Sequence, residues 1–356
     1  MTGRTVLRSI SADGRWWPVV VRRPVPPRPG PEWSLARVTM AGICGSDLRG
    51  LADHDTDGTC DSVVPGHEVV GVVEDGPLAG RRVVVHPLVP CAARAVDPCP
   101  ACRAGRFGQC RSFWAPELRW GKSLGFSAAL GGGWADRVWA HRTMLRPVPA
   151  AVPDRTAVLA EPLSVAVAGL REVRDTAATE VAVVGGGTVG LVTLVAAASV
   201  LPGRRLSAIV RHGFQADAVR ALGAEPSIGP PELTLDGPAL VVDAGGTSSS
   251  LVDAMRAVAA GGTVLTLGNP EDCADLTPLW LKGLTLVGHL EHSAHDVPPP
   301  ALADSLDEAV RLLAATPDLG DLLVTHSFPP DDLVEALAVA RSRETHRAIK
   351  VVLEHP

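Results

Sequence analysis

Four cysteines lie close together in one short stretch of the chain. They fall within twenty residues, and the second and third have the C-x-x-C spacing: Cys91, Cys99, Cys102 and Cys110. Four thiolates close a tetrahedron around Zn²⁺ and leave no open coordination position, so the stretch predicts a structural zinc site. The alternatives are unrelated thiols in a loop rich in Pro and Gly, or a redox pair. No thioredoxin-like context favours the redox pair.

A second set of potential ligands has a different composition. Cys44 lies in G-I-C-G-S-D-L, His67 and Glu68 lie in P-G-H-E, and Glu161 begins E-P-L-S. A thiolate, an imidazole and carboxylates leave a position for water or substrate, as a catalytic zinc ion requires. Each residue alone is more typical of a core or a cap, but together they predict a catalytic centre. Such a metal lowers the pKa of a bound alcohol, and Ser46 is placed to pass the proton onward.

A glycine-rich turn follows an apolar strand pattern in V-A-V-V-G-G-G-T-V-G. Three of its glycines have the G-x-G-x-x-G spacing, which permits a tight turn, a close approach of a pyrophosphate and close helix packing. Free N–H groups at the start of the helix then bind the phosphates. A strand–helix turn without a ligand is the alternative. The residues predicted to contact the cofactor are Gly185, Gly187, Thr188, Val189 and Gly190.

The residues at the end of the next predicted strand, 206–210, indicate which nicotinamide nucleotide is used, NAD(H) or NADP(H). An acidic residue usually binds the ribose 2′-hydroxyl of NAD there, but this chain has Arg211 and His212, and no carboxylate before Asp217. A guanidinium suits a 2′-phosphate, so we expect a preference for NADP(H) over NAD(H). The alternative is that Arg211 is only a solvated strand end.

The elements that must position these residues differ between the two parts of the chain. Short Val-rich runs predict strands at 18–21, 35–40, 68–73 and 82–85. From about residue 155, strands alternate with helices, which predicts a parallel sheet covered on both faces. The predicted strands there are 180–184, 206–210, 239–243, 263–267 and 284–287, and the predicted helices follow the glycine turn to about 201 and span 215–222 and 248–260. The last part predicts helices at 302–314 and 331–341 and strands at 324–328 and 348–353.

Composition argues against two classes of partner. The chain has 356 residues, 46% of them hydrophobic, which is room for about two globular domains. A net charge of −6 without a basic run argues against a nucleic-acid partner. The N-terminus lacks the apolar core of an export signal, and the glycines in the uncharged segment 181–201 favour a strand, turn and helix over a membrane span. We therefore expect a cytoplasmic protein with a small-molecule substrate.

The order of these motifs resembles the zinc-containing medium-chain dehydrogenase/reductase family, and within it the polyol and threonine dehydrogenase branch. The resemblance extends from about Pro31 to the closing A-I-K-V-V-L. It implies an α/β fold in which a GroES-like β-rich catalytic domain, residues 1–162 and 291–356, is interrupted by a Rossmann domain, residues 163–290. It also implies an active site between the domains, and a homodimer or homotetramer.

The resemblance further implies residue roles and two zinc ions per chain. Cys44 and His67 would bind the catalytic zinc, and Glu68 and Glu161 would bind it or exchange with water. Ser46 would relay the proton, and Asp47 would hold the ring of His67. The structural zinc would be held by Cys91, Cys99, Cys102 and Cys110.

Two departures from the family pattern stand out. Seven residues, rather than two, separate Cys91 from Cys99, so either the loop bulges or Asp97 replaces Cys91 as the fourth ligand. Arg49 stands where many members have a relay histidine, and His54 is a substitute only if it is not a solvated loop residue.

The predicted function is hydride transfer between NADP(H) and a secondary alcohol or ketone of the polyol, sugar, cyclitol or amino-alcohol type. Two alternatives stay open. One is a zinc-independent NADPH double-bond reductase of the same superfamily, against which Cys44 and the G-H-E motif argue. The other is a non-enzymatic NADPH-binding protein on the same scaffold, since a fold does not guarantee a function.

Overall fold

The computed structural model describes residues 2–10, 16–50, 63–114, 123–126, 130–270, 272–289 and 305–356. The chain folds into two compact units. Unit 1 contains Met1–Glu161 and Val297–Pro356, and unit 2 contains Pro162–Asp296. Unit 1 has a mixed sheet and unit 2 a parallel one, which confirms the predicted α/β class.

Unit 2 is built on a six-stranded parallel sheet. Its strands are β8 (Glu180–Val184), β9 (Arg205–Val210), β10 (Glu225–Ile228), β11 (Leu240–Asp243), β12 (Thr263–Thr266) and β13 (Thr285–Gly288). Their order is β10-β9-β8-β11-β12-β13, so the chain changes direction across the sheet between β8 and β11. The two central strands are almost wholly buried because helices cover both faces. Ligands of such sheets bind at the point where the order reverses.

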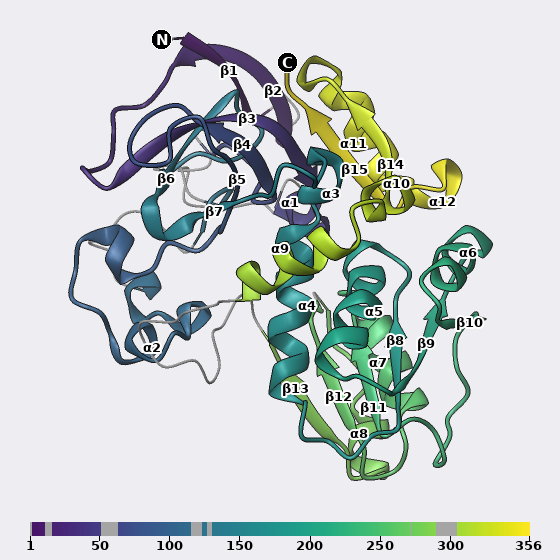
Figure 1. Ribbon diagram of the computed structural model, residues 1–356. Helices are drawn as coiled ribbons and strands as arrows, with labels where there is room; N and C mark the ends of the chain where they lie inside the picture. The colour runs from purple at the N-terminus through teal and green to yellow at the C-terminus, as the bar shows by residue number, and fades with distance from the viewer. Residues whose placement is uncertain are drawn as a thin grey trace. The chain divides into compact units, whose positions relative to one another are not determined.

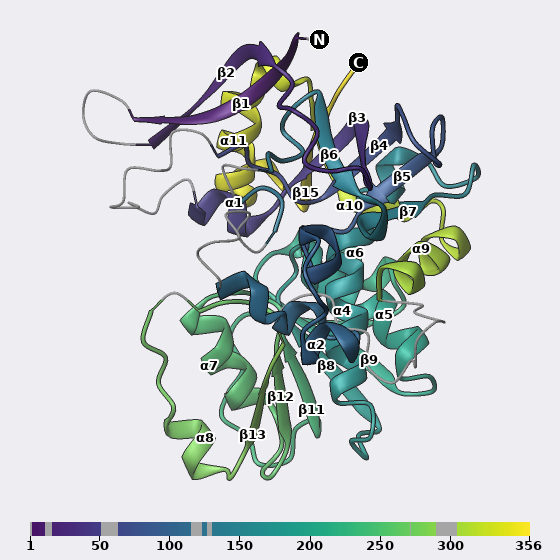
Figure 2. The same ribbon diagram turned by 90° about the vertical axis from the view of Figure 1, so that its left-hand side faces the viewer.

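The helices of unit 2 lie on both faces of this sheet. α5 (Thr188–Val200) and α6 (Gly213–Ala221) lie on one face, and α7 (Ser248–Ala257) and α8 (Thr277–Leu281) on the other, as Figures 1 and 2 show. Right-handed crossovers between parallel strands produce this arrangement. Segment 181–201 is β8, the glycine turn and α5. Within the described residues, no helix is long and apolar enough to cross a membrane.

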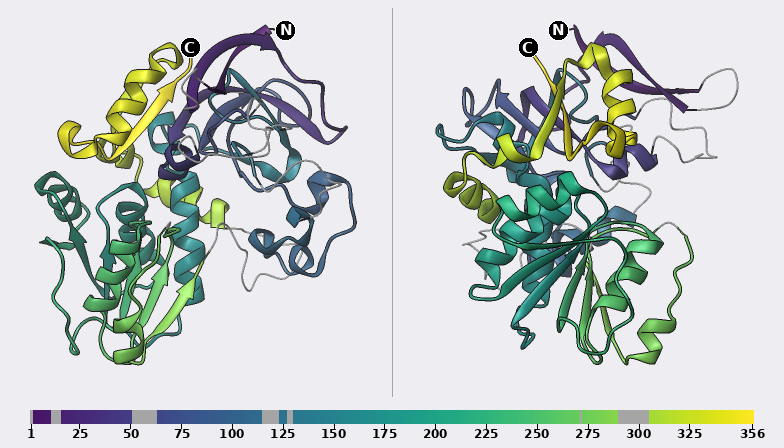
Figure 3. Two further views of the ribbon diagram at one scale, coloured as in Figure 1. Left: turned by 180° about the vertical axis from the view of Figure 1, so that it is seen from behind. Right: turned by 90° about the vertical axis from the view of Figure 1, so that its right-hand side faces the viewer.

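Unit 1 contains a sheet assembled from both ends of its chain. The strands are β3 (Trp33–Ile43), β4 (Val69–Val73), β5 (Arg82–Val85), β6 (Arg137–His141), β7 (Leu145–Pro147), β14 (Val324–Phe328) and β15 (Lys350–Glu354). The order is β14-β15-β3-β4-β5-β7, and β6 also pairs with β3. β15, drawn in yellow in Figures 1 and 3, runs antiparallel to β3 and sets Val351 opposite Ile43. The C-terminal strand therefore lies beside the residue that precedes Cys44.

The remaining elements of unit 1 are two strands that pair with each other and a set of α- and 3₁₀-helices. They are β1 (Thr2–Ile10), β2 (Trp16–Pro24), α1 (Gly45–Gly50), η2 (Cys91–Arg94), α2 (Pro100–Arg103), η3 (Phe107–Gln109), η4 (Arg111–Trp114), η6 (Arg142–Met144), α3 (Asp154–Ala157), α9 (Ser305–Ala315), α10 (Leu319–Leu323), η7 (Pro330–Asp332), α11 (Leu333–Arg341) and α12 (Arg343–His346). One further helix, α4 (Ala160–Glu172), begins at the end of unit 1 and continues into unit 2. Residues 302–304 of the predicted helix 302–314 lie outside the described residues.

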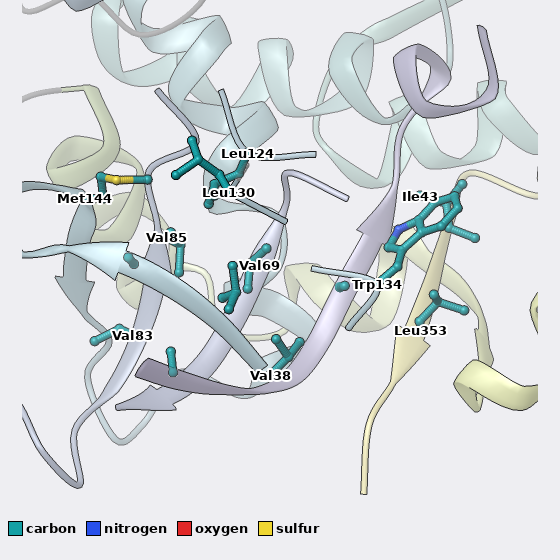
Figure 4. Close-up of a cluster of buried hydrophobic side chains, with 14 of the residues drawn as sticks. Val38, Ile43, Val69, Val83, Val85, Leu124, Leu130, Trp134, Met144 and Leu353 are labelled. Carbon is teal, nitrogen blue, oxygen red and sulfur yellow. The ribbon is translucent and has the colours of Figure 1, made fainter. Parts of the chain in front are cut away.

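The core of unit 1 lies against the sheet that carries the site. Figure 4 shows Val38, Ile43, Val69 and Leu353 converging from β3, β4 and β15. All four are at most 2% exposed, and Trp134, the largest fully buried side chain among the described residues, belongs to the same core cluster. The Trp134 ring also donates from Nε1 to the Gly42 carbonyl at 3.3 Å. This packing makes the end of β3 a rigid support.

Candidate active site

Asp47 organises the loop that follows β3. Cys44 is the first residue after the strand, and its N–H donates to Asp47 Oδ2 at 2.8 Å. The Gly66 N–H donates to Asp47 Oδ1 at 3.3 Å, and the same oxygen lies 3.2 Å from His67 Nδ1. Asp47 is only 3% exposed, so one buried carboxylate joins the segment of Cys44 to the segment of His67.

The local backbone allows His67 to reach this position. Gly66 has a φ of +96°, which favours glycine, and a Cβ there would lie 2.4 Å from Cδ1 of the Trp134 ring. Nδ1 of His67 is hydrogen-bonded to Asp47, so Nε2 remains as the ring nitrogen that can bind a metal. Ser46 Oγ lies 3.4 Å from Nε2. The Phe126 ring, 44% exposed, tilts over His67 at 5.1 Å between centroids.

Glu68 points toward the same place and pairs with a lysine from the other end of the chain. Its Oε2 accepts from Lys350 Nζ, and both side chains are only 1% exposed. Lys350 Nζ also donates to the Ile43 carbonyl at 3.3 Å. A Cβ on Gly42 would lie 1.7 Å from Glu68 Oε2, so the glycine leaves the space that the carboxylate fills. Glu161 is also buried, at 7% exposure.

Three potential ligands come together here. One ligand atom each from Cys44, His67 and Glu68 lie within 4.8 Å of one another. A thiolate, an imidazole and a carboxylate form a donor set that fits zinc and leaves a position open for a further ligand. The structure therefore groups three of the four residues that the sequence predicted for the catalytic metal, and the negative charge of Glu161 acts on Glu68.

The pKa values at this centre reflect burial and close charges. Burial opposes the charged form of His67, but Asp47 and Cys44 outweigh it and raise the pKa of the ring well above 6.5. Protons therefore compete with a metal for Nε2, and metal binding should weaken as the pH falls. Burial raises the pKa of Glu68, and the charge of Glu161 adds to the rise, while Lys350 opposes it.

The four cysteines of the lobe at 91–110 form a second group. Their sulfur atoms all lie within 4.8 Å of one another, with 3.5 Å between Cys91 and Cys110, and none forms a disulfide. Cys99 precedes α2 and its sulfur accepts from the Cys102 N–H at 3.5 Å. Hydrogen bonds outweigh burial and lower the pKa of Cys99 to about 6. Asp97 is exposed and does not belong to the group.

The glycine turn has the geometry expected of a phosphate site. Gly185 has a φ of +119°, and its N–H donates to the Ile209 carbonyl at 2.9 Å. A Cβ on Gly190 would lie 1.9 Å from the Gly185 carbonyl oxygen, so only glycine permits this contact. Gly187 is the N-cap of α5, and Thr188 and Val189 begin the helix. The free N–H groups of its first turn can bind an anion.

Arg211 lies directly after β9. Its N–H donates to Gln215 Oε1 at 3.1 Å, and its Nη2 donates to Ser249 Oγ, at the start of α7, at 3.1 Å. His212 is the N-cap of α6. The first carboxylate that follows, Asp217, forms an ion pair with Arg220 at 3.0 Å.

Sequence reasoning missed Lys350, and it left the proton route unresolved. Lys350 interrupts the apolar pattern A-I-K-V-V-L, and a lone lysine inside a buried strand was the signal that could have found it. Arg49 is half-buried in α1 at the position of the family's relay histidine, and His54 lies outside the described residues.

Comparison with known proteins agrees with this architecture. Residues 30–150 match the alcohol dehydrogenase GroES-like domain family. The chain is 30% identical over 351 residues to a probable zinc-binding alcohol dehydrogenase of Mycobacterium tuberculosis, an alignment that covers 95% of this chain and 86% of that protein. It is 27% identical over 334 residues to D-arabinitol dehydrogenase 1 of Uromyces fabae, with 87% of each covered.

A crystal structure of a putative zinc-binding dehydrogenase from Sinorhizobium meliloti 1021, bound to NADP, has the same fold. It covers 99% of each chain with a TM-score of 0.76 and 22% identity. The chain belongs to the zinc-containing medium-chain dehydrogenase/reductase family. It is therefore an oxidoreductase.

Proposed function

We propose that this enzyme transfers hydride between NADP(H) and a secondary alcohol or ketone of the polyol, sugar, cyclitol or amino-alcohol class. The observation that carries the proposal is the grouping of Cys44, His67 and Glu68 within 4.8 Å, beside the Ser46 hydroxyl. The similarity to D-arabinitol dehydrogenase 1 supports a polyol-like substrate.

In this proposal Cys44, His67 and Glu68 would hold the catalytic zinc, and Glu161 would bind it or exchange with water. When bound, zinc acts as a Lewis acid toward the substrate oxygen, and the nicotinamide accepts or supplies the hydride. Oxidation removes a hydride from carbon and a proton from the hydroxyl group, and it yields ketone, NADPH and H⁺. Ser46 takes up that proton and passes it onward. Asp47 keeps Nε2 of His67 directed at the metal.

The preference for NADP(H) rests on Arg211. The side chain is exposed at the end of β9 and donates to Ser249 Oγ, so a guanidinium and a hydroxyl from different elements lie side by side. A guanidinium and a hydroxyl suit a 2′-phosphate, which an acidic residue would repel. The phosphates of the same cofactor would bind at Gly185, Gly187, Thr188, Val189 and Gly190, with His212 near the ribose.

The second zinc of the proposed pair is structural. Cys91, Cys99, Cys102 and Cys110 supply four sulfur atoms in one group, a donor set that fits zinc and leaves no open position. Because Asp97 is exposed outside that group, Cys91 is the better fourth ligand. The lobe would then be closed by the metal rather than by disulfides.

We also propose a homodimer that forms through the β13 edge of unit 2. β13 is the last strand of its sheet and leaves backbone groups available for pairing. Four large apolar side chains on α8, β13 and the residue before α8 are exposed by 38–82%: Leu276, Trp280, Leu281 and Leu286. Light scattering of the wild type and of L286K tests this, because a monomeric wild type would contradict the dimer.

Elemental analysis combined with kinetics tests the proposed activity. We expect about two zinc ions per chain in the wild type and about one in both C44S and C102S. C44S should lose turnover on a polyol panel but still bind NADPH. The proposal fails if C44S keeps near-wild-type turnover, and the cofactor preference fails if NAD is strongly favoured over NADP.

A further inference from the structure

The cysteine lobe contains a buried arginine that the proposed reaction does not use. Arg94 is 7% exposed and ends the 3₁₀ turn η2, which begins at Cys91. The next residue, Ala95, has a φ of +55°, and its N–H closes the turn on the Cys91 and Ala92 carbonyls. The turn therefore directs the chain back on itself just after the first cysteine and leaves the Arg94 side chain inside the lobe.

Contacts with the Val89 carbonyl and the Phe113 ring hold the Arg94 side chain in place. Its Nε donates to the Val89 carbonyl at 2.9 Å, on the segment before Cys91. Its guanidinium carbon lies 5.6 Å from the centroid of the Phe113 ring, on the segment after Cys110. The Phe113 N–H in turn donates to the Cys110 carbonyl at 3.3 Å. The guanidinium therefore connects the two segments that carry the fully buried cysteines.

A cation in the lobe would stabilise the negative charge of a zinc ion bound by four thiolates. Four thiolates and one Zn²⁺ carry a net charge of −2, and Cys91 and Cys110 are both 0% exposed. Burying such a charge is costly unless an opposite charge lies nearby. Burial lowers the pKa of Arg94, and the Cys110, Cys91 and Cys102 thiolates oppose that fall, so those thiolates are the charges that act on the guanidinium.

We propose that Arg94 is the counter-cation of the four-cysteine metal site and slows the release of its zinc. The inference rests on the structural zinc of the proposed function. Arg94 lies within the seven residues that separate Cys91 from Cys99, the feature in which this chain departs from its family. The spacer between these two cysteines thus brings a cation into the lobe. Arg94 is a positioning residue, because it acts through the thiolates and does not bind the metal.

Zinc release to a chelator, followed with a metallochromic dye, tests the proposal. The phase of zinc release that is present in the wild type and missing in C102S reports the zinc of the cysteine lobe. In R94Q we expect this phase to be about tenfold faster, the lower end of the effect of outer-shell partners. R94K keeps the charge and should release zinc at a rate within about threefold of wild type, by the same scale. R106Q, which removes an exposed arginine of the same lobe, should behave as wild type.

Cobalt substitution gives a second readout that a purely structural role would not change. The thiolate-to-cobalt charge-transfer band should shift in R94Q and stay in place in R94K and R106Q. If R94Q yields no folded protein, R94M supplies the uncharged comparison with a side chain of similar length. Equal release from R94K and R94Q, or an unchanged rate in R94Q, would overturn the proposal. A wild-type lobe without zinc would instead remove the proposed structural site, and this inference with it.

Discussion

Lys350 and Glu68 form an ion pair in which each side chain is 1% exposed, and the pair joins the last strand of the chain to a proposed zinc ligand. The carboxylate occupies space that Gly42 leaves open. Because the ammonium group also donates to the carbonyl before Cys44, one lysine contacts both sides of the proposed catalytic centre. Lys350 therefore restrains Glu68, and its charge opposes the rise in the pKa of Glu68 that burial and the charge of Glu161 cause.

The first prediction concerns this ion pair. K350M should destabilise the metal-free protein by about 3–5 kcal/mol, because it leaves a buried carboxylate without its partner. E68Q combined with K350M should cost less than the sum of the single changes, since the neutral amide no longer needs a cation. Urea unfolding of the two single variants and the double variant measures the coupling. Strict additivity would show that the two side chains do not interact.

A second prediction concerns Asp47. D47N should reduce the affinity of the site for catalytic zinc about 10–100-fold, because the amide holds His67 less firmly than the carboxylate does. The cysteine-lobe zinc should be unaffected. Competition with a chelator, followed by elemental analysis, separates the two metals. D97N is a matched control, because Asp97 is exposed in the other zinc lobe. Unchanged affinity in D47N would contradict the role of Asp47.

Arg211 provides a third prediction. R211Q should raise the KM for NADP at least about tenfold, as expected for the loss of a charged hydrogen bond worth about 1.5–3 kcal/mol. The KM for NAD should change little, because NAD lacks the 2′-phosphate. R220Q serves as the control, since Arg220 is an exposed arginine of α6 that pairs with Asp217. An equal rise in KM for NADP and NAD would mean that Arg211 supports the fold rather than the preference for NADP.

The fourth prediction concerns acid stability at Asp136. Burial alone would raise the pKa of this carboxyl, but hydrogen bonds from His355 and Arg4 outweigh it and lower the pKa to about 2. Since the folded pKa is depressed below the ordinary 3.8, the stabilisation is complete above pH 3.8 and is lost as the pH falls toward 2. After an allowance for solvent screening, we expect about 1–2 kcal/mol at neutral pH.

Chemical denaturation of D136N and wild type between pH 7 and pH 2 measures this contribution. The difference between them should be constant at neutral pH and should shrink as wild-type Asp136 becomes protonated. D331N is a useful comparison, because Asp331 also pairs with Arg4 but is 63% exposed. A gap between D136N and wild type that did not change down to pH 2 would contradict the depressed pKa.

Local sequence was sufficient for the features that depend on neighbouring residues. The predicted strands at 82–85, 180–184 and 324–328 have the observed bounds. The first two are Val-rich runs between turns, a local pattern that favours strands. The positive φ of Gly185 and the close approach at Gly190 follow from the turn itself. The family and the α/β class, both predicted, are confirmed.

Tertiary structure decided the elements whose own residues are poorly suited to them. β10 reads E-P-S-I and was not predicted as a strand, but it forms at the sheet edge, where proline's missing N–H is tolerated. α4 was not predicted either, because its E-P-L-S start was read as a ligand motif rather than as the first turn of a helix.

The features of the candidate site also fall into those that local sequence determines and those that depend on the tertiary structure. The sequence by itself determined which residues are the candidates for the chemistry, since Cys44 and Asp47 are three residues apart and His67 and Glu68 are adjacent. Only the tertiary structure decided what holds them. Glu68 and Lys350 are 282 positions apart, and their contact exists because β15 pairs with β3. Charge pairing in a buried site depends on distance in space, and the pattern of residues along a chain does not encode that distance.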